Sequence, residues 1–254
     1  VMNGEYAGMK LSQLWNEHPE LFGKEKAEGV FPLLTKIIDA KADLSIQVHP
    51  SDDYAKVHEN GSLGKTECWY ILDCPEGATL VVGHNAKDKE ECAKMIHEGR
   101  WSEFIREVPI RKGDFVSIVP GTVHAIKAGV MLLETQQNSD ITYRVYDYDR
   151  LSNGRKRELH IEKSIDVINA PASPAQDSIH NFANVRKNKP VLMEKSAYYK
   201  VWKLVVEDGS ELQLSREKDF DSSYLLASVV AGSGYINGTA IKKGDHFIVT
   251  NECD

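Results

Sequence analysis

The sequence predicts an all-β-dominated fold of two double-stranded β-barrels of the jelly-roll kind, the first with short helices inserted. Short strand-forming segments recur along most of the chain and are separated by Gly, Asp and Pro turns. The segment Lys112–Val116 is loosely repeated as Lys243–Ile248, which places a similar Gly-Asp turn before an inner strand in each half. A polar, proline-bearing stretch separates the halves. We therefore expect a metal-binding first barrel over residues 1–168, a linker over 169–190 and a second, smaller barrel over 191–254.

Helices are expected mainly in the first half of the chain. Apolar residues between Lys10 and Phe22 recur at helical spacing, and Gly23 follows as a stop signal. Asp88 and Glu91 have the spacing of a capping box at the start of another helix, which runs to about residue 99. The remaining short helices are expected at residues 52–59 and 101–106.

Strands are expected where apolar and polar residues alternate, or where strand formers lie between turns. Residues 44–49 alternate cleanly, so Gln47 and His49 share the polar face of that strand, and Pro50 ends it. The other strands expected in the first barrel are residues 66–72, 115–119, 124–126, 131–137 and 141–148. Those expected in the second barrel are residues 198–206, 211–214, 223–230, 234–237 and 246–250.

The composition excludes several classes of protein. The 254 residues contain 31 Lys and Arg against 38 Asp and Glu, a net charge of −7, with 41% hydrophobic and 27% charged residues. These values are ordinary for a globular protein and exclude collagen, a coiled coil and bulk disorder. A negative chain without a clustered basic face argues against a nucleic-acid partner. The apolar runs are far shorter than the roughly 20 residues of a membrane-spanning helix, so no membrane partner is expected.

The cysteines and the two ends of the chain indicate the cellular compartment and whether the sequence is part of a longer protein. No Cys-x-x-Cys spacing occurs, which argues against a disulfide framework, and the first residues lack the pattern of a signal peptide. We therefore expect a reducing, cytoplasmic compartment. Val at position 1, and an end at Asp254 directly after the last expected strand, lead us to expect part of a longer protein.

Polar residues at the ends of several expected strands suggest a metal site. Gln47 and His49 project from one face, roughly 6.7 Å apart along the backbone at about 3.3 Å per residue. Lys65 and Glu67 repeat this spacing on the next strand, and His124 follows a Pro-Gly turn. Two neutral imidazoles and a carboxylate are suitable ligands for a borderline divalent ion such as zinc. They leave positions for Gln47 and for water or substrate, as a Lewis-acid site requires.

Other polar residues have alternative explanations. His84 follows an apolar strand and is expected in a loop, with a second possibility that it lines the pocket. Arg144 lies in a mostly apolar strand and needs a partner, either an ion pair with Asp140 or Glu134 or an anionic substrate. The remaining histidines are expected to be surface or hydrogen-bonded residues: His18, His58, His97, His160, His180 and His246.

Five segments together resemble one enzyme family. They are residues 44–50, 64–70, 120–125, 134–140 and 144–150. In order and in residue type they resemble type I mannose-6-phosphate isomerase in its short bacterial form, a zinc-dependent enzyme of the cupin superfamily. The resemblance extends through nearly all of the chain to about residue 168, and more loosely beyond it.

The resemblance implies a substrate, a reaction and residue roles. The substrate is a sugar phosphate, and mannose 6-phosphate and fructose 6-phosphate interconvert through a cis-enediolate. The implied metal ligands are His49, Glu67 and His124, with Gln47 as an additional ligand and Arg144 as the catalytic arginine. Lys65, beside Glu67 on the pocket face, is expected to bind a substrate oxygen or the phosphate. The general base stays open among a hydroxide on the metal, Lys65 and His84.

Two other functions stay open from sequence. A non-haem iron oxygenase also uses two histidines and one carboxylate with open positions. A non-catalytic cupin that binds sugar phosphate as a sensor needs the same pocket without turnover.

Overall fold

The computed structural model describes residues 1–25 and 29–253, which divide into two compact units. The larger unit comprises Pro32–Asn184 and Ser196–Tyr198. The smaller unit comprises Val1–Phe31, Val185–Lys195 and Tyr199–Asp254. In the described part of the chain, every helix is too short or too polar to cross a membrane.

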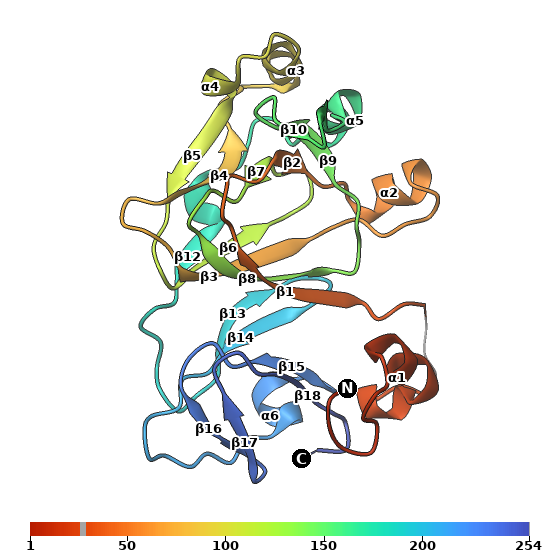
Figure 1. Cartoon of the computed structure of the whole chain (residues 1–254), viewed down its shortest axis with the longest axis vertical. Helices are drawn as coiled ribbons and strands as arrows, with labels where there is room; N and C mark the ends of the chain where they lie inside the picture. The colour runs from red at the N-terminus through yellow and green to blue at the C-terminus, as the bar shows by residue number, and fades with distance from the viewer. Residues whose placement is uncertain (26–28, 254) are drawn as a thin grey trace. The chain divides into compact units, whose positions relative to one another are not determined.

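In the described residues of the larger unit, two five-stranded antiparallel sheets form the framework (Figure 1). The first sheet, in the order β1-β8-β3-β6-β12, contains β1 (Leu33–Asp39), β3 (Glu67–Asp73), β6 (Asp114–Ile118), β8 (Met131–Gln137) and β12 (Ile179–Asn181). The second sheet, in the order β5-β4-β7-β2-β9, contains β2 (Ile46–Val48), β4 (Thr79–His84), β5 (Ile105–Pro109), β7 (His124–Ala125) and β9 (Tyr143–Tyr146). The sheet-rich fold with few helices agrees with the predicted dominance of β-structure.

The two sheets pack face to face around one apolar core. Trp69, Val116 and Leu132 from the first sheet contact Leu80 and Val82 from the second, and each is at most 1% exposed. Because successive side chains of a strand point to opposite faces, these residues define the inner face of each sheet.

Three helices cover the outer face of the second sheet (Figure 1). They are α3 (Lys89–His97), α4 (Trp101–Phe104) and α5 (Ile161–Val167). Ile46 and Val48 of β2 pack there against Ile96 and Phe104. The larger unit also contains α2 (Asp52–His58), the 3₁₀ turn η2 (Ala175–Asp177) and the hairpin strands β10 (Leu151–Ser152) and β11 (Arg155–Lys156).

The predicted cap of α3 forms in part. The Asp88 carboxylate accepts a hydrogen bond from the Glu91 N–H at 2.8 Å, as the capping-box spacing predicts. The Glu91 carboxylate accepts from the N–H of Lys87 rather than from that of Asp88. The helix therefore starts at the predicted residue with a slightly different pattern of hydrogen bonds.

Residues 169–184 belong to the larger unit instead of a linker. Strand β12 pairs with β6, with Ile179 opposite Val116, and the Asn169 N–H donates to the Gly121 carbonyl at 2.9 Å. The sequence did not indicate β12, because its three residues are too few to show an alternating pattern and the surrounding segment contains several prolines. The unit accordingly extends to Asn184 instead of residue 168.

Residues 1–31 belong to the smaller unit, although the sequence places them in the first barrel. Phe22, which is fully buried, packs edge-on against Trp15 at 5.1 Å, Phe31 at 5.8 Å and Tyr224 at 5.2 Å between ring centroids. The Asn251 N–H also donates to the Leu21 carbonyl at 2.7 Å. Aromatic contacts between the two ends of the chain decide this placement, and local periodicity does not reveal them.

Within its described residues, the smaller unit contains three two-stranded sheets, β13-β14, β15-β18 and β16-β17. Their strands are β13 (Val191–Lys195), β14 (Lys200–Lys203), β15 (Leu225–Ser228), β16 (Ser233–Ile236), β17 (Thr239–Lys242) and β18 (His246–Val249). Its helices are α1 (Leu11–Glu17), the 3₁₀ helix η1 (Pro19–Phe22) and α6 (Arg216–Phe220). Pro19 divides the expected helix 10–22 because proline cannot continue the hydrogen-bond ladder of α1. Residues 211–214, expected as a strand, have no regular structure.

The repeated Gly-Asp turn has the same geometry in both units. Gly113 and Gly244 have φ angles of 86° and 94°, a region that favours glycine. In each turn the following residue, Asp114 or Asp245, accepts a 2.8 Å hydrogen bond from the backbone N–H three positions earlier. The echo seen in the sequence is therefore a repeated structural element.

A buried arginine joins the last segments of the smaller unit. Arg216 is 6% exposed, and its guanidinium donates to four backbone carbonyls, those of Ser222, Ser223, Asn251 and Cys253. We expect Arg216→Met to lower the free energy of unfolding by about 3 kcal/mol, because these carbonyls lose charge-assisted hydrogen bonds. Urea titration followed by hydrogen exchange in peptides of the smaller unit measures the change.

The control for Arg216→Met is Lys218→Met, which changes an exposed cation on the same helix. It should leave the unfolding midpoint nearly unchanged. Equal stability of the two variants would contradict the role of Arg216.

Candidate metal centre

Four of the predicted site residues lie in or directly after strands of the two facing sheets. Gln47 is the central residue of β2, and His49 follows the last residue of that strand. His124 is the first residue of β7 and lies opposite Gln47 in the sheet. Glu67 is the first residue of β3 on the other sheet.

The structure brings His49, Glu67 and His124 together in the interior. Their potential ligand atoms all lie within 4.8 Å of one another. Nε2 of His49 is 3.5 Å from Oε2 of Glu67, and Nε2 of His124 is 3.3 Å from Oε1. The three side chains are 1%, 0% and 0% exposed. In the part of the chain that the structure describes, this is the one group of three such side chains with metal-ligand spacing.

Backbone carbonyls orient both imidazoles. Nδ1 of His49 lies 2.8 Å from the Ile141 carbonyl oxygen, and Nδ1 of His124 lies 2.8 Å from that of Thr122. Since a carbonyl only accepts, each Nδ1 donates to its carbonyl, and the Nε2 of each ring faces Glu67. Oriented ligands of this kind typically surround a bound metal.

Several buried ligand atoms lack hydrogen-bond partners. Nε2 of His49 and both carboxylate oxygens of Glu67 are shielded from solvent and accept no hydrogen bond of normal geometry. Lys65, 6% exposed, places its Nζ 2.9 Å from Glu67 Oε2 as an ion pair. Unsatisfied buried acceptors that converge on one point are costly unless a cation lies among them. This donor set of two imidazoles and one carboxylate suits zinc.

Burial and charge keep these ligands in their metal-binding forms. Burial lowers the pKa of His124 to about 3, against the opposing attraction of Glu67. Burial raises the pKa of Glu67, but its neighbours His49, His124 and Lys65 outweigh this effect and hold that pKa well below its usual range. His124 is therefore neutral and Glu67 is ionised at neutral pH, as metal binding requires.

The Gln47 amide extends the cluster along the second sheet. Its Nε2 lies 3.3 Å from Nε2 of His124. Because the two ends of an amide exchange places by a half-turn of the side chain, the Gln47 oxygen can occupy the same position as an additional ligand.

Arg144 lies beside Gln47 on the same face of the second sheet. The two residues are paired across β9 and β2, and a bulge at this point places Tyr146 opposite Ile46 on the helix-covered face. Simple alternation along the strand predicts that Tyr146 and Arg144 share one face. Because of the bulge, they lie on opposite faces. The Arg144 Nη1 donates to the Glu158 carbonyl at 2.7 Å, while its Nε is buried without a partner.

The charge on Arg144 has no ion-pair partner among the described residues. Glu134, one of the two acidic partners suggested by sequence, pairs with Lys36 instead. Burial, together with the charge of Arg157, lowers the pKa of Arg144 below its ordinary value. An unpaired guanidinium beside a cluster of metal ligands is well suited to bind an anion.

Sequence reasoning missed a second polar group on the inner face of the first sheet. Lys36 Nζ donates to Glu134 Oε1 at 2.9 Å and to Gln136 Oε1 at 2.6 Å, while Trp69 Nε1 donates to Glu134 Oε2 at 3.1 Å. Gln136 lies directly opposite Glu67 across β8 and β3. The available signal was the alternation of Glu134 and Gln136 in β8, which places both side chains on one face. Lys36 could not be added to this group, because β1 was not among the expected strands.

His84 is neither a loop residue nor a part of the centre. It is the last residue of β4, is 3% exposed, and stacks on Phe104 with 5.1 Å between ring centroids. Its Nε2 lies 2.9 Å from the Asn169 carbonyl, and its Nδ1 accepts from the Ala86 N–H at 3.2 Å. Both ring nitrogens are therefore engaged by backbone groups outside the His49–Glu67–His124 cluster, which argues against His84 as the general base.

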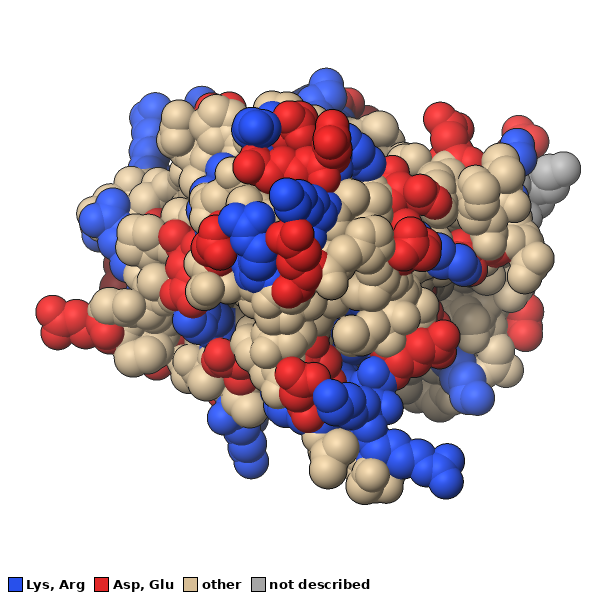
Figure 2. Space-filling model, turned by 90° about the horizontal axis from the view of Figure 1, so that it is seen from above, with Lys and Arg blue, Asp and Glu red and all other residues tan. Residues whose placement is uncertain are grey.

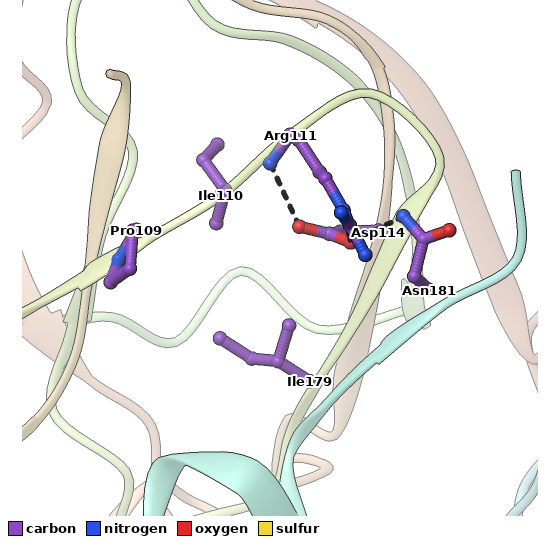
Figure 3. A pocket seen from close by; sticks show the side chains of 6 residues that line it. All are labelled: Pro109, Ile110, Arg111, Asp114, Ile179 and Asn181. Carbon is purple, nitrogen blue, oxygen red and sulfur yellow. Dashed lines mark hydrogen bonds and ion pairs between the residues drawn. The ribbon is translucent and has the colours of Figure 1, made fainter. Parts of the chain in front are cut away.

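A separate hollow of about 370 Å³ lies elsewhere in the larger unit (Figure 3). It is lined by Pro109, Ile110, Arg111, Asp114, Ile179 and Asn181. The Asp114 carboxylate accepts from the Arg111 N–H at 2.8 Å and from the Asn181 amide at 2.7 Å (Figure 3). These contacts stabilise the turn and the β6–β12 pair, and none of the metal-site residues lines the hollow.

The face drawn in Figure 2 bears on binding partners. Acidic and basic side chains lie side by side there, and no uniformly basic area is visible among its described residues. With a net charge of −7, the chain as a whole repels anions, so attraction of any anionic ligand would depend on local cations.

An ion-pair network stabilises the loop that follows β9. Asp147, 4% exposed, accepts hydrogen bonds from Arg157 Nε at 2.7 Å, Arg157 Nη2 at 2.5 Å and Arg150 Nη2 at 2.5 Å. Hydrogen bonds from Arg157, with a further contribution from Arg150, lower the pKa of Asp147 to about 2 against the opposing effect of burial. The carboxylate thus contributes stability above its unfolded pKa of about 4, and this contribution is lost as the pH falls toward 2.

We expect Asp147→Asn to lower the free energy of unfolding at pH 7 by about 2 kcal/mol, with the difference from the parent chain vanishing near pH 2. Urea unfolding at a series of pH values measures it. Asp149→Asn, which removes only an exposed pair with Lys156, is the control and should show little change. A difference between Asp147→Asn and the parent that does not depend on pH would contradict the prediction.

Comparison with known proteins adds independent observations. Residues 1–66 match the family described as phosphomannose isomerase type I, catalytic domain. The chain is 48% identical to mannose-6-phosphate isomerase ManA of Bacillus subtilis over 254 residues, which cover 98% of this chain and 78% of that protein. It is 46% identical to the mannose-6-phosphate isomerase of Streptococcus mutans over 260 residues, which cover 99% of this chain and 78% of that protein.

Solved structures agree with the sequence relatives. The crystal structure of a mannose 6-phosphate isomerase from Bacillus subtilis matches with a TM-score of 0.86 at 43% identity, covering 99% of this chain and 79% of that one. A variant of phosphomannose isomerase from Salmonella typhimurium shares the fold with a TM-score of 0.68 at 14% identity, covering 97% of this chain and 81% of that one. The extent and the level of identity to its relatives show that the chain belongs to the type I mannose-6-phosphate isomerase family.

Proposed function

We propose that this chain is a zinc-dependent aldose-ketose isomerase that interconverts mannose 6-phosphate and fructose 6-phosphate. The observation that carries the proposal is the buried cluster of His49, Glu67 and His124, whose potential ligand atoms all lie within 4.8 Å of one another. Its family supports the sugar-phosphate substrate, because the relatives are named for this reaction.

The metal ligands in this proposal are His49, Glu67 and His124, with Gln47 as the additional ligand. A zinc ion held by them would supply Lewis-acid polarisation of a sugar oxygen. Glu67 contributes the one negative charge of the set, and it forms an ion pair with Lys65.

Arg144 stabilises the charge that develops on the substrate. Isomerisation moves a proton between C2 and C1 of the sugar through a cis-enediolate, whose oxygens carry negative charge. The Arg144 guanidinium keeps a buried Nε without a partner and lies beside Gln47, so it can donate charge-assisted hydrogen bonds to those oxygens. Lys65 binds a sugar oxygen or the phosphate from the side of Glu67.

The proton transfer is assigned to groups that border the metal ligands. Lys65 contacts Glu67 directly. Glu134, on the neighbouring strand β8, pairs with Lys36 on β1, which also contacts Gln136. Each is an acid-base group within the polar part of the inner face, and a general base must come within about 3 Å of the proton. Separate substitution of Lys65 and Lys36 distinguishes them, because loss of the base removes one limb of the pH–rate profile.

We also propose that the larger unit is a cupin-type barrel and that the smaller unit is a related, reduced one. Two antiparallel sheets that enclose an apolar core, with the metal ligands between them, support the first statement. The repeated Gly-Asp turn supports the second.

The test is an assay that couples fructose 6-phosphate formation to a dehydrogenase. The whole chain is stripped with a chelator, and then zinc, Fe²⁺ or Mg²⁺ is restored separately. We expect turnover to disappear on chelation and to return with zinc. Turnover that resists chelation would contradict the zinc dependence. Saturable sugar-phosphate binding without turnover would instead identify a binding protein, and oxygen consumption with Fe²⁺ an oxygenase.

A further inference from the structure

The segment Glu158–His160, just before α5, contacts Arg144 at three points. The Arg144 N–H donates to Nδ1 of His160 at 3.1 Å, and the His160 N–H donates to the Arg144 carbonyl at 2.8 Å. The Arg144 Nη1 donates to the Glu158 carbonyl at 2.7 Å. One short segment therefore contacts both the backbone and the guanidinium of the same residue.

The position of Arg144 explains why such contacts are needed. It lies on β9, the last strand of the second sheet, so no further strand pairs with its outer edge in the described part of the chain. His160 supplies both missing partners, its own N–H for the carbonyl and its imidazole nitrogen for the N–H. A side-chain nitrogen thus replaces the carbonyl of an absent neighbouring strand.

The contacting segment is itself firmly anchored. The His160 carbonyl accepts from the Ser164 N–H at 2.8 Å and from its hydroxyl at 2.7 Å, and Ser164 is fully buried. Ile161 and Ile165 of α5 pack against the apolar cluster on the outer face of the second sheet. A helix held in this way can transmit rigidity to the edge strand.

We propose that His160 is a positioning residue, which holds Arg144 at the edge of the sheet in the orientation that isomerisation requires. The inference rests on the proposed function and adds a residue to it. His160 does not reach the substrate in this proposal and acts through Arg144. A displacement of about 1 Å in a catalytic group can cost about 100-fold in rate, so the loss of one backbone contact is enough to be measured.

Two substitutions at His160 separate positioning from packing. His160→Phe keeps a ring against Tyr143, whose ring centroid lies 6.1 Å away, but removes the acceptor. His160→Asn restores an acceptor atom at the position of Nδ1. We expect His160→Phe to lower kcat by roughly 10- to 100-fold, as is typical for loss of an orienting partner, with zinc content and KM nearly unchanged. His160→Asn should recover most of kcat.

Hydrogen–deuterium exchange of peptides that contain Tyr143–Tyr146 gives a second readout that needs neither substrate nor turnover. Exchange in β9 should be faster in His160→Phe than in the parent chain, and His160→Asn should return it toward the parent value. His97→Leu is the matched control. It removes an exposed histidine that pairs with Glu162 of α5 and does not touch Arg144, so both readouts should stay at parent values.

The outcomes are decisive in both directions. Coupled loss and recovery of kcat and β9 protection would support the positioning role. Unchanged kcat and exchange in His160→Phe, or no recovery in His160→Asn, would overturn it. If the parent chain has no isomerase turnover, the proposed function fails by itself, and the exchange comparison still shows whether His160 holds β9.

Discussion

Replacement of Glu67 by Gln is expected to remove measurable isomerase activity and to lower zinc affinity by more than the roughly 100-fold that loss of an outer partner can cost. Glu67 supplies the only carboxylate within the ligand cluster, and both of its oxygens are buried, with Lys65 as an ion-pair partner of Oε2. Gln is nearly isosteric but neutral, so a zinc ion loses its charged ligand. Zinc content after dialysis, together with the coupled assay, measures both effects.

The control for Glu67→Gln is Glu90→Gln on the exposed surface of α3, which should bind zinc and turn over as the parent chain does. Near-ultraviolet circular dichroism of each variant establishes that the fold is intact. A folded Glu67→Gln chain that retains one zinc ion per chain and normal turnover would refute the assignment of the ligand set.

Arg144→Ala should lower kcat by about 10²- to 10³-fold, the usual cost of a donor to a developing oxyanion, while zinc content stays at the parent level. Arg144 lies next to the ligand Gln47, yet it is not itself a zinc ligand in the proposal. Arg144→Lys keeps the charge but loses the planar fork that reaches both the Glu158 carbonyl and the substrate, so it should recover little activity.

Single-turnover kinetics and zinc analysis on the same preparations separate the two contributions of Arg144. Arg111→Ala serves as the control, because Arg111 is an exposed cation at the hollow of Figure 3, and its side chain is 77% exposed. Normal kcat in Arg144→Ala would exclude the catalytic role. Parallel loss of zinc and kcat would instead place Arg144 among the residues that support the metal.

The sequence predicted the elements that are specified by neighbouring residues, through hydrophobic alternation, turn residues or a helix cap. The strand expected over residues 131–137 is β8 with the same ends, and Asp88 begins α3 as its spacing predicts. β1 was not expected, because most of its residues are only partly buried and its stability comes from pairing along its whole length with β8. The sequence of β1 therefore does not by itself indicate a strand, because its pairing with β8 is what stabilises it.

In the candidate site too, the sequence predicted what depends on nearby residues and missed what depends on distant ones. Alternation placed Gln47 and His49 on one face, and residue types indicated a zinc-like ligand set, which the fold brings within 4.8 Å for His49, Glu67 and His124. The residue types did not reveal Lys36 as the partner of Glu134, since the two are 98 positions apart in the sequence.

The sequence by itself determined the chemistry that this protein has available: two imidazoles, a carboxylate and an arginine at strand positions, and a repeated Gly-Asp turn in each half. These features follow from residue type and from spacing over a few residues. Tertiary structure alone decided that residues 1–31 belong with the C-terminal segments, that a bulge separates Tyr146 from the face of Arg144, and that His160 completes the edge of β9. The physical reason is that each of these depends on contacts between distant segments, and local periodicity carries no information about which distant groups will meet.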